Sequence, residues 1–193
     1  MRPFVGENEV MEINMQLANK HDFTVDNIED LTKDMRAELI DGQIFYFATP
    51  SLEHQELLGN LYYILRSYIE EHDGSCNVYV APVSVWLNQD NKTYLEPDVI
   101  VVCDPDKLQE DGCNGAPDLI IEIASKSTQQ RDYGLKMLKY RTAGVKEYWI
   151  VDPLKQTVMV YWFENENLNC LYSMQDEIEF HLFPGLNVQL LEN

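Results

Sequence analysis

The spacing of apolar residues changes along the chain, and it predicts the order of helices and strands. Residues 36–40 and 43–48 are two apolar-rich runs separated by Asp41-Gly42, a dipeptide that favours a two-residue hairpin turn. After Ser51, a candidate N-cap, apolar residues fall at positions 57, 58, 61, 64, 65 and 68, which is the spacing of one helical face. The first part of the chain is therefore predicted to form an N-terminal β-hairpin followed by a helix.

The second half of the chain reads mainly as strands. The runs at 97–103 and 117–124 are rich in valine and isoleucine without alternation, which is typical of strands buried on both faces. A helix is expected at 127–143, ended by Gly144. Further strands are expected at 77–87, 146–151, 157–163 and 168–173. This order predicts an α/β (α+β) domain at 21–193, with a mixed central β-sheet flanked by helices, after a loosely ordered arm at 1–20.

Composition excludes several classes of protein. The chain has 193 residues with 45% hydrophobic positions, enough for one globular domain with a sizeable core. No apolar run approaches the roughly 20 residues that span a bilayer, and the first residues lack the apolar region of a signal peptide. The four cysteines are scattered without zinc spacing, and we expect no disulfide framework and a reducing cytoplasm as the location.

The net charge of −19 argues against indiscriminate binding to nucleic acid. Basic residues nevertheless concentrate between residues 126 and 146, a stretch that contains six of the 14 lysines and arginines and a single acidic residue. This basic window is either the solvated face of a helix or a surface that contacts phosphates. In the second case Lys139 and Arg141 are the expected phosphate contacts.

Two acidic residues stand inside apolar strand runs. Asp98 follows Pro97 at the head of one run, and Glu122 lies among isoleucines in the other. An ionised carboxylate in such surroundings is costly unless it is paired, hydrogen-bonded or bound to a metal. If the two runs are neighbouring strands, the two carboxylates form the oxygen-rich site that Mg²⁺ or Mn²⁺ prefers. The alternative is a structural ion pair between Glu122 and a nearby lysine or arginine.

Short motifs in a fixed order cover residues 24–190. They are ELIDG at 38–42, PS at 50–51 with His54, EPD at 96–98, PDLIIEIAS at 117–125, ST at 127–128, AGV at 143–145, EYWIVDP at 147–153 and FPGL at 183–186, with Asp132, Lys136 and Tyr140 between them. Taken together, the chain resembles the Uma-type family of restriction endonucleases, within the PD-(D/E)XK nuclease superfamily. The resemblance implies a restriction-endonuclease-like fold and metal-dependent hydrolysis of phosphodiester bonds in DNA. It also implies that Asp98, Glu122 and the backbone carbonyl of Ile123 hold one or two Mg²⁺ or Mn²⁺ ions.

The chain departs from the superfamily motif at one position. Ala124 stands where the motif has a lysine, two residues after Glu122. Lys136 can supply the missing cation from the next helix, because Asp132, Lys136 and Tyr140 are spaced four residues apart on one helix face. Such a cation would orient the attacking water and offset developing negative charge. Lys126 is the competing donor, and a structural pairing of Lys136 with a neighbouring acid is the alternative.

Glu38 and His54 are candidate supporting residues. Glu38 matches the position of a further acid that the family takes from its N-terminal element, and otherwise it is an ordinary strand glutamate. His54, in the first turn of its helix, can cap amides, serve the site or hydrogen-bond Glu38. No G-x-S-x-G, H-E-x-x-H, P-loop or G-x-G-x-x-G motif supports another reaction class.

The expected partner is DNA, bound by a possible homodimer that presents two copies of the basic window. One rival is a binding or scaffold protein that keeps the nuclease fold without cleaving. Another is an acidic inhibitor that mimics DNA, which leaves the basic window unexplained.

Overall fold

The computed structural model describes residues 6, 8–10, 12, 23–26, 36–87 and 90–192. Residues 8–10, 12, 25 and 26 are helical, while most of the arm predicted at 1–20 lies outside the described residues. The division into an arm and one domain therefore stays a prediction.

The predicted hairpin is confirmed. β1 (Ala37–Ile40) pairs antiparallel with β2 (Gln43–Tyr46). Asp41 and Gly42 have positive φ values of 51° and 77°, as a two-residue turn between twisted strands requires. The apolar side of the hairpin packs into a small core of its own, with Leu39 and Ile44 fully buried.

The first long helix is also confirmed. α3 (Leu52–Glu71) begins after Ser51, whose side chain accepts a hydrogen bond from the His54 amide at 3.1 Å. Its buried positions repeat at helical spacing and are Leu57, Leu58, Leu61, Leu65 and Ile69. These side chains face the central sheet.

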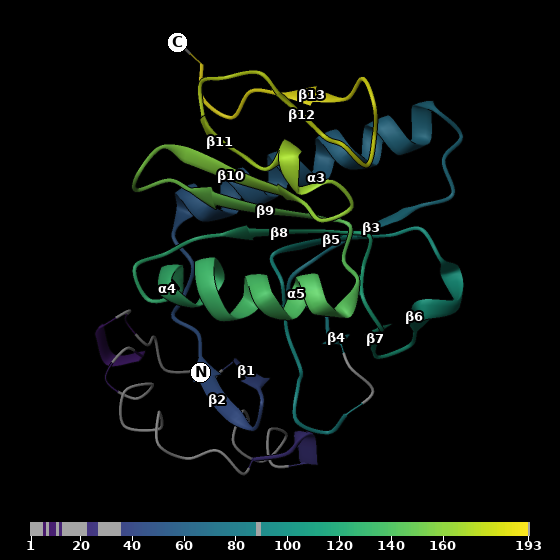
Figure 1. Cartoon of the computed structure of the whole chain (residues 1–193). Helices are drawn as coiled ribbons and strands as arrows, with labels where there is room; N and C mark the ends of the chain where they lie inside the picture. Colours follow the sequence, from purple (N-terminus) through teal and green to yellow (C-terminus); the bar gives the residue numbers. More distant parts are fainter. Residues whose placement is uncertain are drawn as a thin grey trace.

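The central sheet contains six strands: β3 (Asn77–Val80), β5 (Val99–Val102), β8 (Leu119–Ile123), β9 (Glu147–Asp152), β10 (Thr157–Trp162) and β11 (Cys170–Ser173). Their order is β11-β10-β9-β8-β5-β3 (Figure 1). β8 and β9 are parallel and the other neighbouring pairs are antiparallel, so the sheet is mixed as predicted. The two apolar runs that carry Asp98 and Glu122 are indeed neighbours in it, as β5 and β8.

The helix expected at 127–143 is built from three consecutive pieces. α4 (Gln129–Arg131) leads into the π-helical turn η2 (Asp132–Lys136) and then into α5 (Met137–Ala143), which Gly144 ends with a φ of 94°. A π-helical turn inside a helix is uncommon and often lies at a functional site. Here it carries two of the candidate site residues, Asp132 and Lys136.

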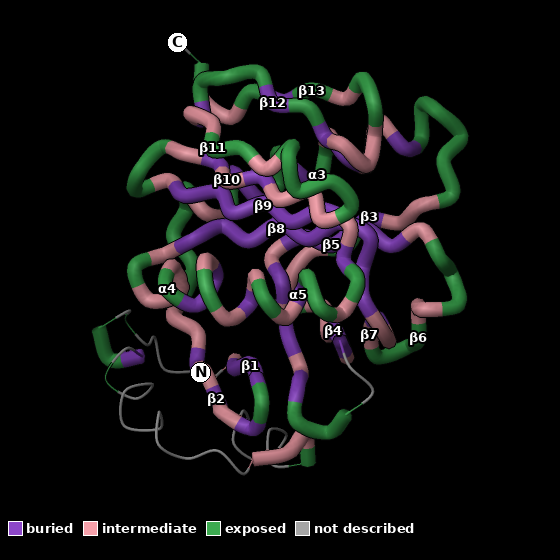
Figure 2. The backbone as a smooth tube through the Cα atoms, in the orientation of Figure 1, coloured by how far each residue is buried: buried purple, intermediate pink, exposed green. Residues whose placement is uncertain are grey.

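Helices cover both faces of the sheet. α3 packs against the side chains of Val99 and Ile121, whereas α5 packs against those of Ile100 and Ile120 on the opposite face. The middle strands are buried along their length, as the tube in Figure 2 shows. This agrees with the prediction from their unbroken apolar runs.

The strand expected at 77–87 is interrupted. β3 ends at Val80, the Ala81-Pro82 peptide bond is cis, and β4 (Val85–Trp86) joins a separate three-stranded sheet. Pro82 has no N–H to donate to a strand ladder, which agrees with the end of β3 two residues before it. The partners of β4 in this small sheet are β6 (Leu108–Gln109) and β7 (Gly112–Asn114).

The remaining short elements surround the sheet. η1 (Pro105–Lys107) and η3 (Glu166–Leu168) are 3₁₀ turns, and β12 (Ile178–Glu179) pairs with β13 (Asn187–Val188). In the part of the chain that the structure describes, no helix combines the length and the hydropathy needed to cross a bilayer.

One disulfide corrects the expectation that none would form. Cys76 and Cys103 are bonded, with their Cα atoms 3.9 Å apart. They lie just outside the paired ends of β3 and β5, where the register from Asn77 to Val102 places them opposite one another. Their separation of 27 residues along the sequence hides this proximity, because strand register decides it.

Candidate active site

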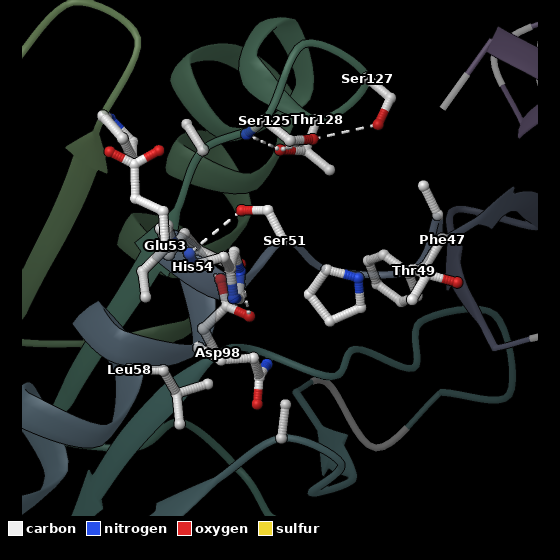
Figure 3. Close-up of a pocket in the computed structure, with 18 of the residues that line it drawn as sticks. Phe47, Thr49, Ser51, Glu53, His54, Leu58, Asp98, Ser125, Ser127 and Thr128 are labelled. Atoms are coloured by element: carbon white, nitrogen blue, oxygen red, sulfur yellow. Dashed lines mark hydrogen bonds and ion pairs between the residues drawn. The ribbon is translucent and has the colours of Figure 1, made fainter. Parts of the chain in front are cut away.

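A pocket of about 390 Å³ opens at the edge of the sheet where β5 begins and β8 ends (Figure 3). The N-terminal turn of α3 forms one wall, with Ser51 and His54. The loop that follows β8 forms another wall, with Ser125 and Lys126. Three separate parts of the sequence therefore converge on one cavity.

Asp98 and Glu122 both line this pocket. The register that pairs Val99 with Ile121 continues by one residue to place Asp98 across from Glu122. Asp98 Oδ2 accepts a hydrogen bond from the Ile123 amide at 2.7 Å, which links the two strands at this edge. The two acids that the sequence singled out are thus brought to one cavity, on adjacent strands.

Lys136 reaches Glu122 from the neighbouring helix. Its Nζ lies 2.8 Å from Glu122 Oε1 and 2.7 Å from Glu38 Oε1, and 3.8 Å from Asp132 Oδ1. The hydroxyl of Tyr140 donates to the same Glu122 oxygen at 2.7 Å. The expected shared face of Asp132, Lys136 and Tyr140 therefore points at Glu122, and the side chain of Lys136 is 1% exposed.

Glu38 is not an exposed strand glutamate. Its side chain is fully buried, and Oε1 accepts from the Glu96 amide at 3.1 Å besides contacting Lys136. The second carboxylate oxygen lies 3.7 Å from Arg131 Nε. The guanidinium of Arg131 in turn lies over the ring of Phe45, 4.9 Å from its centroid. The N-terminal hairpin thus places a buried acid beside Lys136, and a supporting role of Glu38 in the site stays a prediction.

Glu38, Glu122 and Asp132 form a buried acidic cluster around Lys136. Burial and mutual repulsion change the pKa values of Glu122 and Asp132. Burial raises the pKa of Glu122 to about 8, against the opposing effect of the Lys136 ammonium, and the charges of Asp132 and Glu38 raise it further. Burial likewise raises the pKa of Asp132. For Lys136, burial acts to lower the pKa, but the surrounding carboxylates outweigh it and raise the pKa. The surrounding carboxylates therefore favour the ammonium form of Lys136.

His54 pairs with Asp98 and not with Glu38. Its Nε2 lies 3.2 Å from Asp98 Oδ1, and its Nδ1 is buried without a hydrogen-bond partner among the described residues. The imidazole also lines the pocket. A role of His54 in the site stays a prediction.

The remaining basic candidates separate into two groups. Lys126 is exposed and lines the pocket. Lys139 is ion-paired with Asp41, and Arg141 with Glu166. Neither Lys139 nor Arg141 is among the residues that line this pocket. Their contact with phosphates stays a prediction.

An ion pair in the pocket joins two residues for which the sequence predicted no role. Arg36 and Glu96 both line the cavity and form an ion pair, with Nε and Nη2 of the arginine each 2.7 Å from Glu96 Oε2. Tyr94 donates to the other oxygen of Glu96 at 2.6 Å. Glu96 belongs to the EPD motif at 96–98, which could have marked it as a site residue. Its partner Arg36 is 60 residues away, and no sequence spacing reveals that pairing.

The donor set fits a cation that prefers oxygen and keeps part of its water shell. Among the described residues, no group of three or more histidine, cysteine or acidic side chains is arranged to hold a metal. Asp98, Glu122 and Ile123 nevertheless line one pocket. The register of β5 and β8 continues to place Pro97 opposite Ile123, and a proline has no N–H to donate to the Ile123 carbonyl. Mg²⁺ is commonly bound through one or two carboxylates plus water, which is the kind of donor that these residues offer, and the metal site stays a prediction.

Comparison with known proteins places the fold. A solved structure described as a "putative nuclease belonging to DUF820" from Anabaena variabilis matches with a TM-score of 0.71 at 19% identity, over 87% of this chain and 95% of that one. An uncharacterized protein of Synechocystis is 25% identical over 146 residues, which are 74% of this chain and 75% of its own length. Residues 25–190 match the Uma2 family, described as "Putative restriction endonuclease". The chain belongs to this family and has a restriction-endonuclease-like fold.

Proposed function

We propose that this protein is a divalent-metal-dependent endonuclease that hydrolyses phosphodiester bonds in DNA. One observation carries the proposal: Asp98 and Glu122 line one pocket from adjacent strands, and Glu122 is held by the buried ammonium of Lys136. Family membership and the nuclease-like fold support the same reaction class.

Asp98, Glu122 and the carbonyl of Ile123 are the residues that would hold Mg²⁺ or Mn²⁺. When bound, such an ion lowers the pKa of a water molecule and offsets charge on the phosphate. In the hydrolysis, the water oxygen forms a bond to phosphorus, the ester P–O bond breaks, and the proton lost by the water ends on the leaving alcohol.

Lys136 acts in this proposal as a positioning residue. Its ammonium is buried and is not among the groups that line the pocket, so it reaches the substrate only through Glu122. Together with the Tyr140 hydroxyl it fixes one oxygen of Glu122, which keeps the orientation of the carboxylate constant. Lys126, exposed on the pocket wall, is the cation that can approach a phosphate directly.

The test is cleavage of plasmid and oligonucleotide DNA with Mg²⁺, with Mn²⁺ and with a chelator. We expect cleavage with metal, none with the chelator, and a large loss in Glu122→Gln. Cleavage by Glu122→Gln at the wild-type rate would remove this site from the reaction.

The alternative is a protein that keeps the nuclease fold for binding alone. The occupation of Glu122 by Lys136 favours it, because the ammonium already neutralises one of the two carboxylates. Absence of cleavage with both metals, together with retained DNA binding, would support this alternative. The homodimer stays a prediction, and light scattering at micromolar concentration checks it.

A further inference from the structure

The basic window at 126–146 does not present a cationic face. Arg131 and Lys136 are buried within the acidic cluster around Glu38. Three further members are paired with acids: the partly buried Lys139 with Asp41, the exposed Arg141 with Glu166, and the partly buried Lys146 with Asp118. Among residues 36–87 and 90–192, Lys126 is the member of this window without an acidic partner within ion-pair distance.

The pocket itself is short of positive charge. Its lining contains two cations, Arg36 and Lys126, against four carboxylates, those of Glu53, Glu96, Asp98 and Glu122. The ion pair with Glu96 already neutralises Arg36, and the buried ammonium of Lys136 likewise pairs with Glu122. Apart from a bound metal, Lys126 is therefore the main positive group left to a phosphate in this cavity.

This shortage bears on the form of the substrate. A protein that binds duplex DNA tightly does so largely through many lysine and arginine contacts to the two phosphate backbones. A net charge of −19, with the window neutralised by local acids, does not supply such contacts. The binding energy must come instead from the walls of the pocket.

The pocket walls suit a single nucleotide. Phe47, Pro50 and Leu154 contribute apolar surface, with Leu154 still 59% exposed. Ser127 and Thr128 lie on the wall that follows β8, where their hydroxyl groups are hydrogen-bonded with Ser125 (Figure 3). Lys126 lines the same wall. A cavity of about 390 Å³ is in the range of small-ligand sites. An apolar wall for a base and a polar wall for a phosphate, in a pocket that the two carboxylates also line, match one nucleotide.

We propose that this pocket takes one unpaired nucleotide, and that the substrate is single-stranded DNA in preference to continuous duplex. The inference rests on the proposed function, whose site it uses. A base inside a duplex must be unstacked and unpaired to enter such a pocket, which costs a few kcal/mol. In the basic window, Lys126 is the one described cation without an acidic partner, so the described part of this window offers little to offset that cost.

The first experiment compares one sequence in two forms. Single-turnover cleavage and fluorescence-anisotropy binding are measured in Mn²⁺ with a labelled single strand and with the same strand in a duplex. We expect the single strand to bind and to be cleaved at least about tenfold better, since unpairing costs more than 1.4 kcal/mol. Equal or better binding of the duplex overturns the inference. If neither form is cleaved, the proposed function fails, while the binding comparison still decides this inference.

Matched variants test the two walls. Lys126→Gln should weaken single-strand binding and reduce the slope of log K against log salt by about 0.7, the loss of one phosphate contact on a single strand. Arg66→Gln, an exposed cation paired with Glu70 outside the pocket, should leave the slope unchanged. Leu154→Ala should weaken binding about fivefold by removing apolar contact, whereas Leu171→Ala, equally exposed on β11, should not.

The salt dependence of binding also distinguishes the pocket from the outer face of α5 as the DNA-contacting surface. If the double substitution Lys139→Ala and Arg141→Ala flattens the salt dependence of duplex binding while Lys126→Gln does not, the outer face of α5 is the DNA surface. The single-strand assignment of the pocket then falls.

Discussion

Removing the positive charge of Lys136 should lower the free energy of unfolding far more than removing that of a surface cation. Its Nζ lies within 2.8 Å of carboxylates of both Glu38 and Glu122, and the side chain is 1% exposed. Loss of one partner from a buried ion pair leaves uncompensated charge and costs about 3–5 kcal/mol. For a chain of this size, Lys136→Met should lower the melting temperature by about 6–20 °C.

Urea denaturation followed by tryptophan fluorescence measures the loss in the free energy of unfolding, and thermal denaturation measures the shift in melting temperature. Arg66→Met is the control, because Arg66 pairs with Glu70 while the two side chains are 41% and 59% exposed, and such surface bridges contribute about 0–1 kcal/mol. The double variant Lys136→Met with Glu122→Gln should lose less stability than the two single losses combined, since it removes one of the orphaned charges. If Lys136→Met falls within about 0.5 kcal/mol of the control, Lys136 is not the centre of the cluster.

Three further outcomes follow from the structure. Burial acts to raise the pKa of Asp118, but hydrogen bonds from Lys146 and a backbone amide outweigh it and lower this pKa below its ordinary value of 3.8. The ionised Asp118 therefore stabilises the fold above pH 3.8, and this contribution is lost as the pH falls below that value. Asp118→Asn should make the stability of the protein less dependent on pH in the acid range. Mn²⁺ should raise the melting temperature of the wild type through linkage, and should leave that of Glu122→Ala unchanged. Reducing the bond between Cys76 and Cys103, which closes a loop of 27 residues, should cost about 3.5 kcal/mol in urea denaturation, and equal midpoints with and without reductant would contradict this.

The sequence predicted the parts of the site that follow from local periodicity. Asp98 and Glu122 were conspicuous because each interrupts an apolar strand run, and two such runs joined by a short connection pair in one sheet. The common face of Asp132, Lys136 and Tyr140 followed from helical spacing, which the π-helical turn shifts without removing.

What the sequence did not predict depends on contacts between distant segments. The acidic partner of Lys139 is Asp41, 98 residues away, so the neutralisation of the basic window was invisible from its composition. The same holds for Cys76 and Cys103, which strand register brings together. The burial of Glu38 depends on how the hairpin docks against the helix that carries Arg131, and no local pattern encodes that.

Metal-dependent cleavage by Asp98→Asn tests the central claim most directly. Asp98 lines the pocket on the strand next to Glu122, and its side chain is 17% exposed, so asparagine preserves the shape and removes the charge. Single-turnover cleavage of a labelled DNA strand is measured with Mn²⁺ and with a chelator, after the melting temperatures of both proteins are shown to agree. We predict metal-dependent cleavage by the wild type and a loss of about 10²-fold or more in Asp98→Asn. Equal rates for the two proteins, or undiminished cleavage with the chelator, would contradict a metal site built on Asp98 and Glu122.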